Sequence, residues 1–166
     1  MNIAVISDIH DNIWNLDKAL EIVEKKNINT AIFCGDYCSP TTFKLIVGRF
    51  SKTYCIWGNV DGEKYAIMKF LGDERIENIE MLGDFGEIEI DNLKVAVIHK
   101  PDIAKGLAHS GLYDAVFHGH NHTASKEIIG KTLLANPGEV MGSDGKPSFG
   151  IWDTKKNDIE IIRILI

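Results

Sequence analysis

The first half of the chain repeats one pattern three times, in which a short apolar run is followed by an amphipathic segment. The first amphipathic segment, "LDKALEIVEKK", places Leu16, Leu20 and Val23 on one face of a helix. The apolar runs are typical of buried parallel strands. The pattern predicts strands at 2–7, 30–34 and 53–57, each followed by a helix, at 16–26, 40–50 and 62–71. Strands that alternate with helices in this way form a parallel sheet with the helices packed against it.

The second half of the chain is rich in strands instead. An Asp91-Asn92 turn signal separates "GEIEI" from "KVAVIH", which predicts an antiparallel hairpin. We expect a short helix near Ile103 to Ser110, and further strands at 114–118, 124–130, 131–136, 149–154 and 158–165. This predicts an α/β fold in which two sheets pack face to face with helices outside. Because neither a repeat nor a Pro/Gly-rich linker interrupts the 166 residues, we expect a single domain over 1–166.

Composition narrows the class of partner. A formal net charge of -6 disfavours broad attraction to a long nucleic acid or to an anionic membrane. The sequence offers no run of roughly 18 uncharged apolar residues, so we expect no membrane span. Three cysteines without a CxxC pair suit the reducing cytoplasm, where we expect the protein to reside. The apolar end, "DIEIIRILI", is typical either of an inner strand or of an edge that pairs with another chain, and we expect a homo-oligomer.

Polar residues follow the ends of five predicted strands. In order along the chain they are Asp8 and His10, Asp36, Asn59, His99, and His120 with His122. Ligands of open α/β sheets bind outside the carboxyl ends of the strands, so these residues are expected to converge on one site. Carboxylates, neutral imidazoles and an amide oxygen together suit divalent transition metals. The sequence therefore predicts a metal site at the carboxyl ends of the strands.

Five short blocks carry a resemblance to a known family. The blocks "SDIHDN", "CGDY", "GNVDG", "VIHK" and "GHNH" resemble, in order and approximate spacing, those of the calcineurin-like metallophosphoesterases. Among these enzymes the chain is most similar to the small YfcE-type phosphodiesterases. The resemblance implies a four-layer α-β-β-α sandwich of two mixed sheets flanked by helices. It covers Ile3 to about Gly138, including "NPGE" where relatives often have an NPGS-like turn.

The resemblance also implies two divalent metal ions, with manganese or nickel expected first and iron, cobalt or zinc as alternatives. One ion would be held by Asp8, His10, Asp36 and His122, and the other by Asp36, Asn59, His99 and His120. His118 matches no ligand position, so we assign it to packing or to contacts around the ligands. His109 has no partner pattern and is interpreted as an ordinary surface or core residue.

The activity implied is hydrolysis of a small phosphodiester by a hydroxide that bridges the two ions. Asp36, Asn59 and His99 are the residues expected to be catalytic through these ions. Many relatives carry a histidine after the metal-binding asparagine that assists the leaving group, but this chain has Val60. A general acid commonly contributes about 10²–10⁴-fold in rate, so we expect a preference for aryl diesters over alkyl phosphomonoesters.

Other residues near the motifs have two interpretations each. Asn12 and Lys100 are candidates for substrate binding, but Asn12 could instead cap the helix that begins near Trp14, and Lys100 could be a solvated loop charge. Asp61 could orient the Asn59 loop or help a proton reach the leaving group, and we favour the structural role.

Three rival functions remain open. The first is a non-catalytic interaction scaffold, as a retromer subunit of the family is. The second is a nucleotide phosphohydrolase or phosphatase. The third, a mononuclear structural zinc site, normally uses cysteine or histidine ligands close together in sequence.

Overall fold

A computed structural model describes residues 1–143 and 146–165. Asp144, Gly145 and Ile166 lie outside the described residues, and with them the last residue of "DIEIIRILI" and of the predicted range 1–166. Within the described ranges, every helix is too short or too polar to cross a bilayer.

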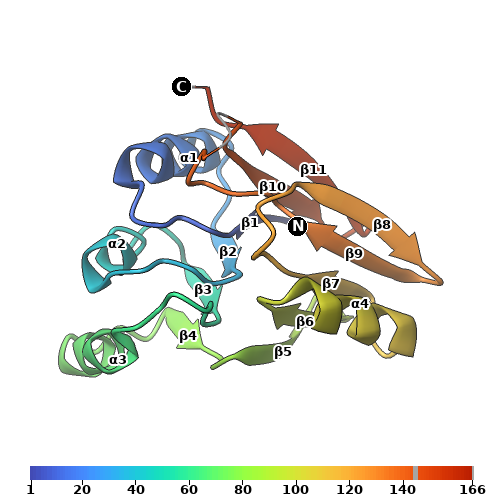
Figure 1. The fold of residues 1–166 in the computed structure, drawn as a ribbon, viewed down its shortest axis with the longest axis horizontal. Helices are drawn as coiled ribbons and strands as arrows, with labels where there is room; N and C mark the ends of the chain where they lie inside the picture. The colour runs from blue at the N-terminus through green and yellow to red at the C-terminus, as the bar shows by residue number, and fades with distance from the viewer. Residues whose placement is uncertain (144–145, 166) are drawn as a thin grey trace.

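The described residues form two mixed sheets (Figure 1). The six-stranded sheet has the order β11-β10-β1-β2-β3-β4. Its strands are β1 (Asn2–Ile6), β2 (Thr30–Phe33), β3 (Lys52–Cys55), β4 (Ile79–Met81), β10 (Ser148–Asp153) and β11 (Asp158–Arg163). The five-stranded sheet has the order β5-β6-β7-β9-β8. Its strands are β5 (Phe85–Ile90), β6 (Leu93–Ile98), β7 (Ala115–Phe117), β8 (Ser125–Ile129) and β9 (Thr132–Asn136).

Four helices flank the sheets among the described residues, namely α1 (Ile13–Lys25), α2 (Pro40–Lys44), α3 (Lys64–Asp73) and α4 (Pro101–Ser110). Figure 1 shows α1, α2 and α3 along the outer side of the first sheet and α4 beside the second. Three apolar clusters lie between the layers. One joins Leu16 and Phe43 to the first sheet, the second lies between the sheets around Trp152, and the third packs Ala104 of α4 on the second sheet. The four-layer α-β-β-α sandwich is therefore confirmed.

The strand and helix alternation of the first half is confirmed, with one difference in helix α2. Strands β1, β2 and β3 pair in parallel, with Val5 opposite Ile32. Helix α2 ends at Lys44, although the pattern predicts a helix to residue 50. The predicted continuation carries β-branched residues, which are weak helix formers, and then Gly48 at φ +76°, a left-handed conformation that ends a helix.

The predicted hairpin of the second half is also confirmed. Asp91 and Asn92 join β5 to β6 with φ values of +52° and +64°, as a two-residue type I′ turn requires. The last two strands belong to the first sheet, because β10 pairs antiparallel with β1 and β11 pairs antiparallel with β10. The apolar C-terminal strand is thus an edge of the first sheet. Pairing of that edge with another chain remains a prediction.

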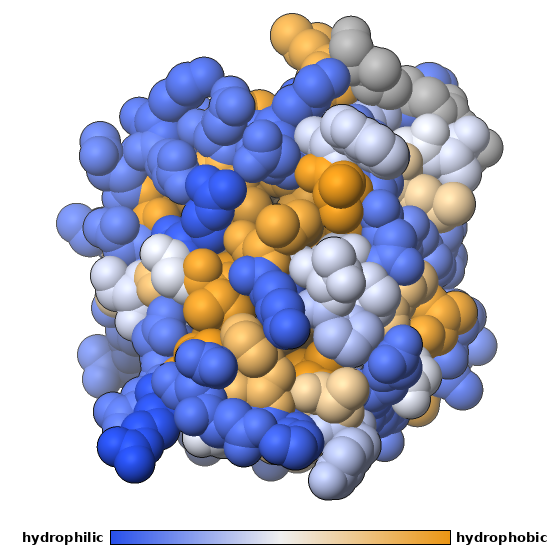
Figure 2. Space-filling model, turned by 90° about the vertical axis from the view of Figure 1, so that its left-hand side faces the viewer, coloured by the Kyte–Doolittle hydropathy of each residue, from blue (hydrophilic) through white to orange (hydrophobic). Residues whose placement is uncertain are grey.

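The outer face of the helical layer mixes charged and apolar surface. Figure 2 shows this face over α1, α2 and α3, where apolar side chains reach the surface between charged ones. Ile13, Leu45 and Met68 are among the exposed apolar residues of these segments.

Candidate metal centre

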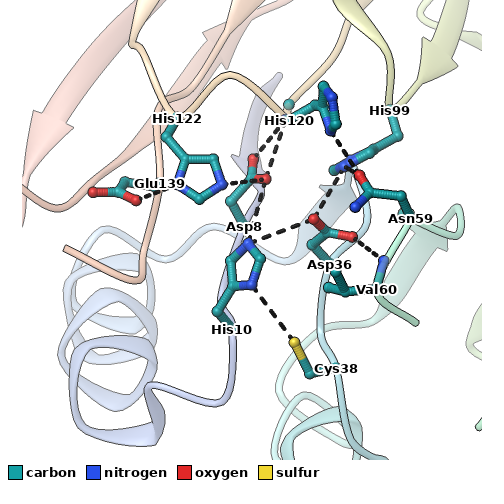
Figure 3. A network of polar contacts seen from close by, with 12 residues as sticks. Asp8, His10, Asp36, Cys38, Asn59, Val60, His99, His120, His122 and Glu139 are labelled. Carbon is teal, nitrogen blue, oxygen red and sulfur yellow. Dashed lines mark hydrogen bonds and ion pairs between the residues drawn. The ribbon is translucent and has the colours of Figure 1, made fainter. Parts of the chain in front are cut away.

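The strand ends bring all seven predicted ligand residues to one place (Figure 3). Asp8 and His10 follow β1, Asp36 follows β2 and Asn59 follows β3. His99 follows β6, and His120 and His122 follow β7. Because β1, β2 and β3 run parallel, as do β6 and β7, the carboxyl ends of both sets open on the same cluster.

The backbone is held in an uncommon conformation at five of these seven residues. Their φ values are positive, at +53° for Asp8, +46° for His10, +59° for Asp36, +75° for His120 and +59° for His122. Residues other than glycine rarely adopt this left-handed backbone conformation, and such backbone strain concentrates at functional sites. The tight turns aim these side chains inward directly after rigid strands.

Two glycines allow the turns to approach one another. A Cβ atom at Gly58 would collide with the side chain and backbone of Asp36. A Cβ atom at Gly119 would collide with the side chains of Ser7 and Asp8. The cluster can therefore close only because these positions lack a side chain.

One half of the cluster contains Asp8, His10 and His122. His122 Nε2 lies 3.4 Å from Asp8 Oδ1, and His10 Nε2 lies 3.8 Å from the same oxygen. The backbone N–H of His120 donates to both oxygens of Asp8, at 3.1 Å each. The ligand atoms of Asp8, His10 and His122 lie within 4.8 Å of one another, which is compatible with a single cation.

The other half is built around Asp36. His99 Nε2 lies 3.1 Å from Asp36 Oδ2 and 3.0 Å from Asn59 Oδ1, while His120 Nδ1 lies 2.6 Å from Asn59 Oδ1. His10 Nε2 faces the same Asp36 Oδ2 at 3.4 Å. A single carboxylate oxygen thus faces imidazoles of both halves, so Asp36 connects the two halves of the cluster.

The electrostatics of the cluster favour a cation. Asp8 is 0% exposed and Asp36 is 1% exposed, so two carboxylates lie out of contact with water. The contact with Asp8 raises the pKa of His10 against the effect of burial. Burial acts to lower the pKa of His99, but Asp36 and the Cys34 carbonyl outweigh it and raise that pKa. The cluster therefore draws in positive charge.

The ligand atoms also fit a metal ion chemically. His10 Nε2 is buried and has no hydrogen bond among the described residues, since both carboxylate oxygens that it faces lie beyond normal hydrogen-bond distance. Buried polar atoms are normally satisfied. A divalent cation held by His10 and the neighbouring carboxylates would satisfy this nitrogen.

Asp61 holds together two of the loops that carry the cluster. Its carboxylate accepts hydrogen bonds from the backbone N–H groups of Asp36, Cys38 and Gly58, at 2.9, 2.9 and 2.7 Å. These bonds tie the loop after β2 to the loop that carries Asn59. The structural interpretation of Asp61 is therefore confirmed.

Glu139 contacts the cluster but was not predicted to do so. Its Oε2 lies 2.6 Å from His122 Nδ1. The sequence signal was available, because Glu139 stands in "NPGE" at the position where relatives often have serine. No local pattern predicts the contact, because Glu139 lies 17 residues from its histidine partner.

The remaining polar candidates lie around the cluster. Asn12 caps α1 by accepting a hydrogen bond from the backbone N–H of Asn15 at 3.1 Å, and its Nδ2 donates to the Met141 carbonyl at 2.7 Å. These contacts support the capping interpretation, and substrate binding by Asn12 remains a prediction. His118 is buried, with Nδ1 3.1 Å from the Gly119 carbonyl. Lys100 is exposed at the start of α4.

Comparisons with known proteins agree with this geometry. Residues 1–157 match the model of the calcineurin-like phosphoesterase superfamily domain. The chain is 37% identical over 161 residues to Phosphodiesterase MJ0936 of Methanocaldococcus jannaschii, covering 95% of this chain and 96% of that protein. A solved structure of an archaeal phosphodiesterase superposes with a TM-score of 0.88 at 35% identity, covering 98% of this chain and 99% of that one. The E. coli phosphoesterase YfcE shares the fold at 18% identity, with a TM-score of 0.65 and coverage of 99% and 100%.

Proposed function

Because this chain belongs to the calcineurin-like phosphoesterase superfamily, we propose that it is a metal-dependent phosphodiesterase that acts on small phosphodiesters. The observation that carries the proposal is the position of Asp36, whose Oδ2 faces His10 and His99 from opposite halves of the cluster. The phosphodiesterase of M. jannaschii, at 37% identity over nearly the whole chain, supports the same activity.

Two divalent cations are proposed as the cofactors. Asp8, His10, Asp36 and His122 would hold one, and Asp36, Asn59, His99 and His120 the other. Such a pair would activate a water molecule for attack and neutralise charge on the phosphoryl group. The mixed oxygen and nitrogen donors suit manganese or nickel, as well as iron, cobalt or zinc.

The leaving group receives no side-chain proton from Val60. Its backbone N–H donates to Asp36 Oδ1 at 3.0 Å, so the residue helps to hold the carboxylate, while its apolar side chain is 41% exposed. Valine cannot act as a general acid. We therefore propose that the enzyme favours diesters with good leaving groups, such as aryl diesters, over alkyl phosphomonoesters.

Turnover of bis(p-nitrophenyl) phosphate tests the proposal. The metal-free protein is supplied with Mn²⁺ or Ni²⁺, with and without a chelator, and an alkyl phosphomonoester is measured beside the diester. We expect diester hydrolysis that requires metal and that Asp36→Asn reduces by at least about 10²-fold, as loss of a charge-stabilising group does. No turnover with any divalent metal would favour a non-catalytic scaffold. Equal or faster hydrolysis of the monoester would contradict the proposed preference.

A further inference from the structure

A cavity of about 390 Å³ adjoins one end of the metal cluster. Asn59 and His99 line it where it meets the cluster, and among the described residues neither His10 nor His122 does. The cavity therefore opens on the half of the cluster that contains Asn59 and His99, and not on the half that contains His10 and His122. A phosphodiester held at the cluster would place one ester group in this cavity, and the other would lie outside it.

The walls of the cavity are largely apolar. Trp57 comes from the loop after β3, Ile98 is the last residue of β6, and Ile103 comes from the first turn of α4. Ile103 is 49% exposed although it is a large apolar side chain. Cavities for small molecules span about 300–1,000 Å³, so this one is large enough for a ring and far larger than a methyl group needs.

The same cavity is also lined by two lysines and two carboxylates, Lys64, Lys100, Asp61 and Asp84, in a chain whose formal net charge is -6. Asp61 is engaged by three backbone N–H groups, and Asp84 is paired with Lys64. Lys64 Nζ lies 5.6 Å from the centre of the Trp57 ring and 2.9 Å from Asp84 Oδ1. Asp84 is highly exposed, and an exposed ion pair of this kind is worth little, so Lys64 can exchange that partner for a ligand. Lys100 has no ion pair among the described residues.

We infer that this cavity, the Trp57 cavity, binds an aromatic ester group that carries a negative charge of its own. The apolar walls would cover the ring, and Lys64 and Lys100 would face its anionic substituent. The inference rests on the proposed function and deepens it, because it names the substrate class as phosphodiesters with one anionic aryl group. Lys100 was a substrate candidate from the sequence, whereas Lys64 was not.

Inhibition by three phosphomonoesters tests this inference, because each carries a single ester group. Methyl phosphate, phenyl phosphate and 4-carboxyphenyl phosphate are compared as inhibitors of bis(p-nitrophenyl) phosphate turnover. We expect phenyl phosphate to bind roughly ten-fold more tightly than methyl phosphate, because the ring is taken out of water. The carboxylate should add a further gain of about two- to five-fold for each lysine that it reaches.

Variants assign the two effects to the cavity. Lys64→Met and Lys100→Met should each reduce the advantage of 4-carboxyphenyl phosphate over phenyl phosphate, while Ile103→Asp should weaken both aryl ligands. Lys126→Met, a change in an exposed lysine outside the cavity, is the matched control.

Two outcomes would overturn the inference. The first is equal inhibition by the three monoesters in the wild type, and the second is a carboxylate preference that survives the Lys64→Met/Lys100→Met double variant. If bis(p-nitrophenyl) phosphate is not turned over at all, the proposed function fails instead. Calorimetric titration of the same ligands into manganese-loaded protein then still tests the cavity.

Discussion

Glu139 Oε2 accepts a hydrogen bond from His122 Nδ1 at 2.6 Å, and Ser143 Oγ donates to the same carboxylate at 2.8 and 2.9 Å. Glu139 is 3% exposed, so the contact is shielded from water. With its proton on Nδ1, His122 presents the lone pair of Nε2 towards Asp8 Oδ1, 3.4 Å away. The carboxylate thereby sets both the tautomer and the direction of the imidazole, as carboxylates behind metal-binding histidines do.

Replacing Glu139 should weaken metal binding. We expect Glu139→Ala to lower the affinity for Mn²⁺ or Ni²⁺ by about 10–100-fold, because loss of such a partner frees the histidine ring. Glu139→Gln keeps a hydrogen-bond acceptor without the charge and should have a smaller effect. Calorimetric titration of the metal-free protein measures the affinity. Glu160→Gln, an exposed change on β11, is the control, and an unchanged affinity in folded Glu139→Ala would contradict the assigned role.

Replacing Asp61 should destabilise the fold as well as the site. Asp61→Ala removes the acceptor of three backbone N–H groups in one step. Leaving buried donors unpaired costs about 1–3 kcal/mol each, so we expect the free energy of unfolding to fall by about 3 kcal/mol or more. Urea denaturation followed by circular dichroism measures this difference. Asp84→Asn, at an exposed position, is the control and should change the free energy of unfolding by less than about 0.5 kcal/mol. Similar values for both variants would show that the hydrogen bonds of Asp61 do not stabilise the two loops.

A methyl group at Gly58 should damage the metal site, whereas one at Gly106 should not. The Cβ of Gly58→Ala would collide with Asp36, so we expect weaker metal binding and a loss of about 1–3 kcal/mol in stability. Gly106 lies within α4 with open space around it, so Gly106→Ala should raise stability by up to about 1 kcal/mol. Urea denaturation and metal titration of both variants compare the two positions. A fully functional Gly58→Ala protein would show that the two loops can separate without cost.

Metal should stabilise the folded protein through the buried carboxylates. A ligand at 100 times its dissociation constant adds about 2.7 kcal/mol of stability, so Mn²⁺ should raise the midpoint of thermal unfolding. Asp36→Asn removes a charge that both halves of the cluster share and should abolish most of that rise. Burial acts to raise the pKa of Asp36, but His99 and the Val60 N–H outweigh it and lower that pKa, so the charge stabilises the folded state. The metal-free variant should therefore unfold at a lower temperature than the metal-free wild type. Thermal scans with and without chelator measure the unfolding midpoints of the metal-free and metal-bound proteins. An equal metal-induced rise in the wild type and in Asp36→Asn would show that the metal does not bind at Asp36.

Local pattern predicted the parts of the fold that depend on neighbours in sequence. The strand runs that end at Ile6, Phe33 and Cys55, and the turn at Asp91 and Asn92, follow from apolar periodicity and from backbone preference. The predicted length of α2 is wrong. The β-branched residues after Lys44 and the left-handed Gly48 end the helix, although the apolar spacing continues to residue 50.

The contacts around the cluster could not be predicted in the same way. Asp61 reaches the loop after β2, 25 residues away, and Glu139 reaches His122 across 17 residues. Lys64 and Ile103 come to one cavity from helices that pack on different sheets. No periodicity or motif encodes these pairings, because each depends on how the layers are stacked.

The amino-acid sequence by itself determined which residue types stand at the ends of the strands, and therefore that carboxylates, imidazoles and an amide would gather where those ends meet. Only the tertiary structure decided how they face one another, which oxygen of Asp36 lies between the two halves, and which buried carboxylate directs His122. The physical reason is that strand and helix formation are governed by short-range periodicity, whereas side-chain direction and burial are set by packing between layers that are remote in sequence.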